Sequence, residues 1–182
     1  GDSPHVLAAL HALDFLRTTD GWEPDYLVLL QPTSPLRQTR HIDQGIELIL
    51  RHNAPSVIAV TETHSHPYLT RQMNTSMGEL KDFLPCPLAY ARRQNLPPAY
   101  FINGALFICR NDVLRREQTF SPQGSLGLTM EAAYSFQIDN AWDLALVDTI
   151  MSRGLLAAFE RGELNHWGWA KSSTIGTVDD EQ

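Results

Sequence analysis

The chain has 182 residues, 43% hydrophobic and 19% charged, a balance typical of one globular domain with a substantial core. A formal net charge of −7 argues against an extended basic surface for nucleic acid. Cys86 and Cys109 are too few and too far apart for a zinc site or a disulfide framework, and no apolar run has membrane-spanning length. We therefore expect a cytoplasmic protein that binds neither nucleic acid nor membrane.

The first predicted element is a helix from Pro4 to Arg17. Ser3 suits the N-cap, Pro4 suits the first helical position, and apolar residues recur on one helical face. The strand Tyr26 to Leu30 follows, and its continuous apolar run is typical of a parallel strand buried on both faces. The chain thus begins at a helix, with no strand before it.

A rigid turn follows this strand. The sequence from Gln31 to Arg37 holds two prolines, which fix an extended conformation and exclude a helix. Open α/β sheets present ligand-binding side chains at the carboxyl ends of their strands, so Gln31 is a candidate ligand contact. The alternative is an ordinary Pro-rich loop in which Gln31 holds its own turn together.

Downstream, residues 42–53 have a helical period, and Pro55 leads into a second buried strand, Ser56 to Thr61. This alternation predicts that the two strands pair in parallel through a right-handed crossover. Residues 62–98 are polar and Pro-rich, and they hold a predicted hairpin around Met77-Gly78. The remaining predicted elements are strands at Ala105–Cys109 and Ser135–Ile138, a helix at Ala141–Met151, and a poorly ordered tail at 165–182.

Three segments, in this order, resemble the signature of the cytidylyltransferases that activate sialic acids and related sugar acids. They are residues 29–37 (LLQPTSPLR), 103–108 (NGALFI) and 135–143 (SFQIDNAWD), and the resemblance runs from about Asp2 to about Ile150. It implies a single domain over 1–182 with a three-layer, Rossmann-like α/β nucleotidyltransferase fold and a mainly parallel sheet. The implied reaction joins CTP and a nine-carbon 2-keto sugar acid into a CMP-sugar and pyrophosphate.

The same resemblance implies that the fold is incomplete at its N-terminus. In the family, a first strand and a basic, glycine-containing loop hold the triphosphate, and we find no such loop in this sequence. We therefore expect that residues 1–182 alone do not turn over CTP. Two alternatives stay open: a non-catalytic sugar-acid-binding or oligomerising remnant of the fold, and a nucleotidyltransferase for another sugar.

Asp139 is the candidate catalytic and metal-binding carboxylate. Mg²⁺ prefers hard oxygen ligands, and Asp139 follows a predicted strand, where such a ligand belongs. The alternative is that Asp139 or Asn140 caps the next helix. The family has two acidic residues at this point, and Gln137 replaces the first of them, which predicts weaker binding of the divalent cation.

The resemblance also implies a set of substrate contacts. Arg93 matches an arginine that binds the carboxylate of the sugar acid across a dimer, and Phe107 stands where the family often has tyrosine. Residues 62–98 match an element that reaches into the partner subunit, so we expect a homodimer. The implied substrate-binding residues are Gln31, Arg93, Asn103, Gly104 and Phe107.

Overall fold

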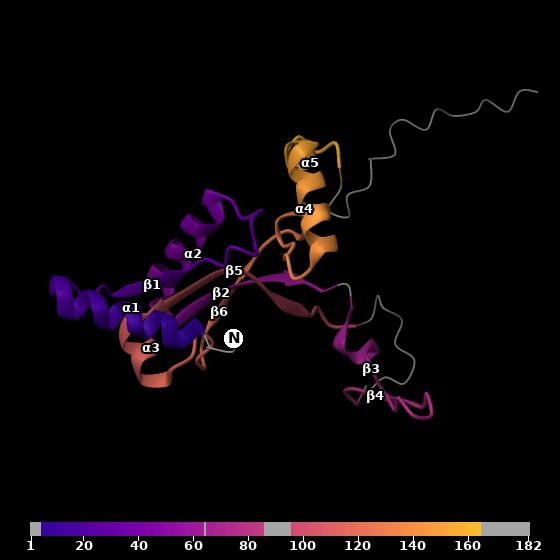
Figure 1. Cartoon of the computed structure of the whole chain (residues 1–182), viewed down its shortest axis with the longest axis horizontal. Coiled ribbons are helices and arrows are strands. Elements are labelled where there is room, and N and C mark those ends of the chain that lie inside the picture. The colour runs from indigo at the N-terminus through magenta and orange to yellow at the C-terminus, as the bar shows by residue number, and fades with distance from the viewer. Residues whose placement is uncertain (1–4, 64, 86–95, 165–182) are drawn as a thin grey trace, which may run out of the picture.

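The computed structural model describes residues 5–63, 65–85 and 96–164, which form an α/β fold with helices on both faces of a four-stranded sheet (Figure 1). The strand order is β1-β5-β2-β6. These strands are β1 (Tyr26–Leu29), β2 (Ser56–Glu62), β5 (Tyr100–Arg110) and β6 (Leu126–Thr129). The predicted α/β class is confirmed.

Five α-helices are formed by the described residues: α1 (His5–Asp20), α2 (Thr39–His52), α3 (Asn111–Glu117), α4 (Ala141–Ser152) and α5 (Leu155–Glu160). The three long ones occur where the sequence predicts helices. Asn53 ends α2 in the left-handed conformation and donates its backbone N–H to carbonyls of the last turn, a frequent way to close a helix.

Two hydrophobic clusters, one on each face of the sheet, make the three layers. On one face, Leu13 of α1 and Leu114 of α3 pack with Cys109 of β5. On the other face, Ile49 of α2 packs with Val57 of β2 and Ile108 of β5. The neighbours Ile108 and Cys109 belong to opposite clusters because successive side chains of a strand point to opposite faces. Burial raises the pKa of the Cys109 thiol to about 11.

The strand pairing differs from the prediction of a mainly parallel sheet with β1 beside β2. Strand β5 lies between them and runs antiparallel to both, and β2 with β6 is the parallel pair. β1 and β2 therefore point the same way without touching. β5 comes later in the chain than β1 and β2 and pairs with both of them. The βαβ pattern of residues 26–61 is local, so it does not predict that a later strand separates these two.

Two local predictions are also corrected. β1 is an edge strand of the described sheet and Val28 is 39% exposed, so the strand is not buried on both faces; Leu30, just after it, is 38% exposed. Residues 135–138 are not a strand; they follow a 3-10 turn, η3 (Ala132–Tyr134), and Ile138 donates one backbone hydrogen bond to Thr33 (2.8 Å). The fourth strand is β6, ahead of that turn.

Strand β5 bulges at its centre. Ile58 pairs with Phe107 and Val60 pairs with Ile102, so one residue separates the two pairs on β2, whereas residues 103–106 separate them on β5. A bulge bends its strand and changes the direction of the side chains and peptides within it. The extra residues include Asn103 and Gly104, and Gly104 has a φ of 70°.

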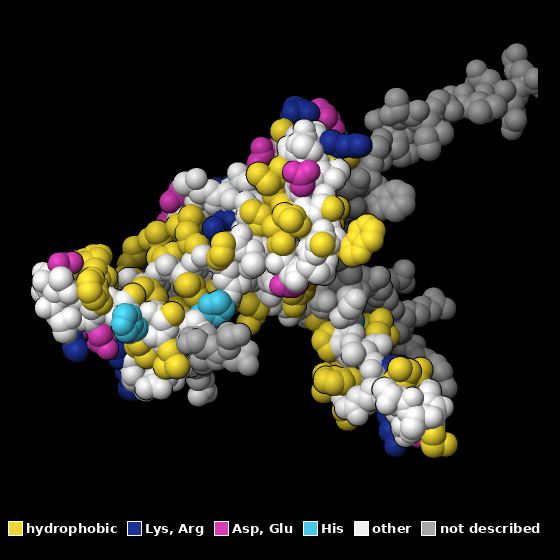
Figure 2. All heavy atoms as spheres, viewed as in Figure 1, with side chains coloured by type: hydrophobic (Ala, Val, Ile, Leu, Met, Phe, Trp, Pro, Cys, Tyr) yellow, Lys and Arg dark blue, Asp and Glu magenta, His cyan; other side chains and the backbone are white. Residues whose placement is uncertain are grey.

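The predicted hairpin around Gly78 is present. Strands β3 (Arg71–Met73) and β4 (Leu80–Asp82) pair antiparallel after a short 3-10 helix, η1 (Pro67–Leu69). The hairpin projects from the body of the sheet on the extended ends of β2 and β5 (Figure 1). Figure 2 shows apolar side chains gathered on this arm, and those that are at least 45% exposed are Leu69, Met73, Met77, Leu80, Phe83, Tyr100, Phe101 and Ile102.

His41 of α2 connects this helix to the η3 turn. Its ring is 2% exposed and packs edge-on against Tyr134, with 5.1 Å between the ring centroids. Burial is the main cause that lowers the pKa of His41. Arg40 stacks over the same Tyr134 ring at 4.5 Å and pairs with Glu160 of α5 at 2.9 Å, so α2, η3 and α5 are held together.

Some predictions concern residues outside the described ranges: the Ser3 and Pro4 helix start, Arg93, and the tail at 165–182. No helix among the described residues is long and apolar enough to cross a membrane. The cytoplasmic location stays a prediction.

Candidate substrate site

Three segments that are distant in sequence meet at the carboxyl end of β1. They are the turn 31–37, the β5 bulge, and the segment 135–139. Ser34 Oγ donates to Asn103 O (3.2 Å), Asn103 Nδ2 donates to Ser135 Oγ (2.9 Å), and Ile138 N donates to Thr33 O (2.8 Å). Each pair of segments is thus joined by at least one hydrogen bond, and the three form one rigid unit.

Side chains satisfy the backbone groups that the bulge removes from the sheet. Asn103 Oδ1 accepts from Ala105 N (3.1 Å), while Ser34 donates to Asn103 O and Arg37 Nη1 donates to Ala105 O (2.6 Å). Buried backbone polar groups without partners are costly, so these three bonds are what allow the bulge to persist inside the fold. Asn103 and Ser34 are fully buried.

Arg37 also fixes the turn itself. The same Nη1 lies 3.4 Å from Gln31 O and 3.5 Å from Ser34 O, in addition to Ala105 O. Partial burial lowers the pKa of Arg37. A guanidinium keeps its charge in spite of such a shift, and it supplies several donors from one rigid plane. Arg37 therefore holds the turn against the bulge.

Gly104 is the point at which polar side chains converge. A β-carbon at this position would clash with Gln31 Oε1, and would lie 2.8 Å from Gln137 Nε2 and 3.2 Å from Ser34 Oγ. The two amides and one hydroxyl thus surround a single backbone position. Together they present both donors and acceptors with no net charge, which suits a ligand rich in hydroxyl groups.

The structure distributes the predicted substrate residues unevenly. It brings together Gln31 and Gly104, and Gln137, the residue predicted for the metal site, lies against the same glycine. Asn103 is next to them, but its side chain is fully buried and bonded within the bulge, so its role is to build the site. Phe107 is half-buried and packs against the core cluster beneath α1 and α3, with its ring 5.8 Å from that of Phe120. Arg93 is outside the described residues.

Asp139 is exposed, and its carboxylate does not cap the helix that follows. Asn140 is the N-cap of α4, and its Oδ1 accepts from Trp142 N (2.8 Å) and Asp143 N (3.1 Å). Asp143 Oδ2 accepts in turn from Asp139 N (3.0 Å) and Asn140 N (3.1 Å), which completes a capping box. Asn140 and Asp143 do the capping, and this leaves the carboxylate of Asp139 available for a cation.

Sequence reasoning missed three residues of this site: His5, Ser34 and Arg37. Ser34 and Arg37 lie in the same turn as Gln31, but they contact β5, which is about seventy residues away in sequence. His5 lies in the first turn of α1, and its Nε2 is 3.4 Å from Gln31 Nε2. No local pattern indicates that contact.

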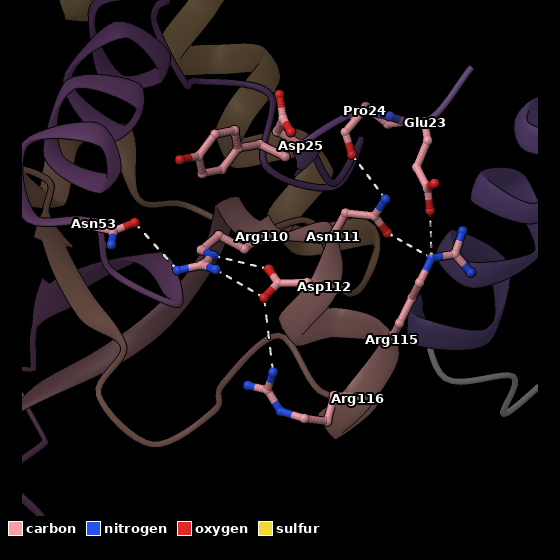
Figure 3. A pocket seen from close by; sticks show the side chains of 10 residues that line it. Glu23, Pro24, Asp25, Asn53, Arg110, Asn111, Asp112, Arg115 and Arg116 are labelled. Atoms are coloured by element: carbon pink, nitrogen blue, oxygen red, sulfur yellow. Dashed lines mark hydrogen bonds and ion pairs between the residues drawn. The ribbon is translucent and has the colours of Figure 1, made fainter. Parts of the chain in front are cut away.

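A separate cavity of about 930 Å³ lies at the other end of β1. Its arginines pair with neighbouring groups: Arg110 pairs with Asp112 (2.9 Å), and Arg115 bonds Asn111 Oδ1 (2.9 Å) (Figure 3). Arg115 also pairs with Asp14 of α1 (2.7 Å), while its Nη2 is buried without a hydrogen-bond partner among the described residues. The guanidinium of Arg110 lowers the pKa of Asp112. These charges balance one another, so the cavity is best explained as a structural ion-pair cluster, and we place the candidate site at Gly104.

No protein-family model matches the chain. Over 130 residues the chain is 33% identical to an N-acylneuraminate cytidylyltransferase of Streptococcus agalactiae serotype V, covering 71% of the chain and 30% of that protein. It is 27% identical over 146 residues to an N-acylneuraminate cytidylyltransferase of Escherichia coli, covering 78% of the chain and 34% of that protein.

A third relative is the CMP-N,N'-diacetyllegionaminic acid synthase of Legionella pneumophila, 27% identical over 128 residues, covering 70% of the chain and 54% of that protein. The chain thus spans about a third to a half of the length of these curated relatives. Among solved structures, it resembles the CMP:2-keto-3-deoxy-manno-octonic acid synthetase complexed with CTP, with a TM-score of 0.51 and 13% identity over 84% of this chain and 70% of that one. This likeness supports the nucleotidyltransferase fold.

The crowding at Gly104 gives a test of the site. We expect Gly104→Ala to lower the free energy of unfolding by about 1 kcal/mol more than Gly78→Ala, as measured by denaturant titration. Both glycines have positive φ, 70° and 72°, so both variants carry the strain of a left-handed L-residue. A β-carbon on Gly78 has nothing within 4 Å, whereas one on Gly104 displaces the polar side chains around it. Equal losses for the two variants would mean that these side chains are not packed around Gly104.

Proposed function

We propose that this chain, a homologue of the N-acylneuraminate cytidylyltransferases, is part of an enzyme that activates a sialic acid-like 2-keto sugar acid with CTP. The products are the CMP-sugar and pyrophosphate. The observation that carries the proposal is the convergence of Gln31, Gln137 and Ser34 at Gly104, at the carboxyl end of β1. Ligands of open α/β sheets bind at this end of the strands.

The sugar acid supplies the nucleophile in the proposed reaction. Its anomeric hydroxyl oxygen forms a bond to the α-phosphorus of CTP, the bond from that phosphorus to the bridging oxygen of the β-phosphate breaks, and pyrophosphate leaves. The hydroxyl proton passes to water, and Asp139 is the proposed catalytic carboxylate because it would hold the divalent cation beside the phosphates. The neutral side chains at Gly104 orient the hydroxyl groups of the sugar, because positioning supplies much of the rate in such transfers.

We propose Mg²⁺ as the cofactor, with Asp139 as a carboxylate ligand. When bound, Mg²⁺ neutralises negative charge on the phosphates. Asp139 fits this role because its carboxylate is exposed and is not used in the α4 cap. No group of three His, Cys, Asp or Glu residues suited to a metal occurs in the part of the chain that the structure describes. A divalent cation here would draw its other oxygens from water and phosphates, as Mg²⁺ usually does, with Gln137 as a neutral neighbour.

The remaining substrate contacts are also proposals. We propose that Arg93, through its guanidinium fork, binds the carboxylate of the sugar acid. Phe107 packs against the hydrophobic cluster of α1 and α3, so we expect it to support the site rather than to touch the sugar. We also propose a cytoplasmic location, because two distant cysteines suit a reducing compartment.

A second candidate function is a non-catalytic sugar-acid-binding or oligomerising protein of the same fold. The observation that favours it is Gln137. Its amide adds no negative charge beside Asp139, and it lies with Gln31 at Gly104, where it can bind a hydroxylated ligand without any metal. Turnover separates the two candidates.

The assay is pyrophosphate release by the full-length protein with CTP and N-acetylneuraminate. We expect CMP-sugar to form, and we expect Gln31→Ala to raise the KM for the sugar acid about tenfold while the KM for CTP stays unchanged, because one ligand hydrogen bond is lost. Gln123→Ala, at an exposed glutamine, is the control. Sugar-acid binding without pyrophosphate release would favour the non-catalytic candidate, and turnover of another sugar alone would overturn the substrate assignment.

The metal role of Asp139 is tested by Mg²⁺ titration of the same reaction. We expect Asp139→Asn to raise the Mg²⁺ concentration needed for half-maximal rate and Gln137→Asp to lower it, because these changes remove and add a carboxylate. Without a cation the added carboxylate should not stabilise the protein, since two adjacent negative charges repel. Asp143→Asn is the control: it weakens the α4 cap and should lower stability without changing the metal dependence. An unchanged metal dependence in Asp139→Asn would rule out this site.

We also propose a homodimer formed through residues 62–98. The support is the exposed apolar surface of the projecting hairpin, for example Met77 at 80% and Leu80 at 62% exposure. Light scattering should give twice the mass of one chain, and Met77→Lys with Leu80→Lys should give monomers, because a buried charge opposes an apolar interface. Wild-type monomers at high concentration would exclude the dimer and any action of Arg93 across it.

A further inference from the structure

His5 of α1 contacts the side-chain amide of Gln31, and the proposed function gives His5 no role. His5 Nε2 lies 3.4 Å from Gln31 Nε2, and His5 is an exposed residue in the first turn of α1. The two residues are twenty-six positions apart. The pairing brings an ionisable side chain to the amide that we assign to sugar recognition.

The chemistry of the two nitrogens determines how they pair. The Gln31 NH₂ donates to His5 Nε2 when the proton of the neutral ring is on Nδ1, because an amide NH₂ can only donate. With its nitrogen held by His5, the Gln31 amide turns its Oε1 toward Gly104. Gln137 points its Nε2 at the same position. The site therefore presents one acceptor from Gln31 and one donor from Gln137.

We propose that His5 is a positioning residue that sets the direction of the Gln31 amide and makes recognition of the sugar acid dependent on pH. This inference rests on the proposed function, because it assigns a ligand to Gln31. A protonated imidazole donates from both nitrogens, so it cannot accept from Gln31 Nε2. The amide must then rotate, presenting its NH₂ toward Gly104, where Gln137 already presents another. The site loses its acceptor and gains two opposed donors.

The other charged groups near His5 have different partners, and none of these contacts is with the Gln31 amide. The ion pairs of α1 join Asp14 to Arg17 (3.4 Å) and to Arg115 of α3 (2.7 Å), and Asp14 is nine residues, about 13 Å of helix, from His5. Near Gln31, the charged neighbour is Arg37, which contacts the Gln31 carbonyl and not its amide. The other titratable and charged groups on α1, on α3 and in the 135–139 segment are His11, Asp20, Asp112, Arg116, Glu117 and Asp139.

The test uses full-length protein with N-acetylneuraminate and CTP between pH 5.5 and pH 8.5. For the wild type we expect the KM for the sugar acid to rise about fivefold to tenfold toward the acid end, while kcat and the KM for CTP change less than twofold. His5→Gln keeps an acceptor oxygen that does not titrate, so its KM should stay near the wild-type value at high pH and lose the dependence on pH. His5→Ala should have the raised KM at every pH. His11→Gln, on an exposed position of the same helix, should behave as the wild type.

A wild-type pH dependence retained in His5→Gln, or an unchanged KM in His5→Ala, would overturn the proposal. A second measurement keeps it independent of the reaction. The side-chain ¹⁵N resonance of Gln31, assigned by its loss in Gln31→Ala, should shift with pH in the wild type and in His11→Gln and should not shift in His5→Gln. If no CMP-sugar forms but this shift is present, the proposed function fails and the coupling of His5 to Gln31 stands. If the shift is absent, the coupling itself is refuted.

Discussion

The bulge in β5 is the constraint on which the site depends. A regular β5 would keep Asn103 and Gly104 in the ladder with β2, with no backbone approaching the turn after β1. The extra residues move Gly104 toward Gln31, and the freed backbone groups find partners in Ser34, Arg37 and the side chain of Asn103. The β5 bulge and the candidate site are thus built by the same residues. Ser34 and Arg37, which satisfy backbone groups of the bulge, therefore also hold the turn that carries the Gln31 amide.

The sequence predicted those features that are encoded locally. The three long helices and the strands at Tyr26 and Ser56 follow from hydrophobic period and from breakers such as Pro55. The prediction of a strand at Ser135–Ile138 is wrong, although Phe136 and Ile138 alternate with polar residues as in a strand. In the structure the segment makes one backbone hydrogen bond to the turn after β1, from Ile138 N to Thr33 O. The place of β5 between β1 and β2, and the contact of His5 with Gln31, arise from tertiary packing alone, which no window of neighbouring residues encodes.

Charge explains the chemical character of the site. The residues that converge on Gly104 are neutral, while the arginines of the far cavity are matched by carboxylates such as Asp112 and Asp14. Amides and hydroxyls discriminate ligands by the direction of their hydrogen bonds rather than by attraction over distance. Such a site suits the proposed recognition of hydroxyl groups, and Asp139 with a cation and Arg93 are the residues proposed for the phosphate and carboxylate groups.

The long sequence separation within the site has a consequence for folding. Ser34 and Arg37 contact β5 across 69 and 68 residues, and Asn103 reaches Ser135 across 32. Contacts that close loops of this length form late in folding, because the chain loses conformational entropy on closing the loop before the contacts stabilise it. The amides cannot come together until β5 has inserted between β1 and β2. A sugar acid would therefore bind only the fully assembled sheet, and its binding energy would add to the stability of that state and of no partly folded one.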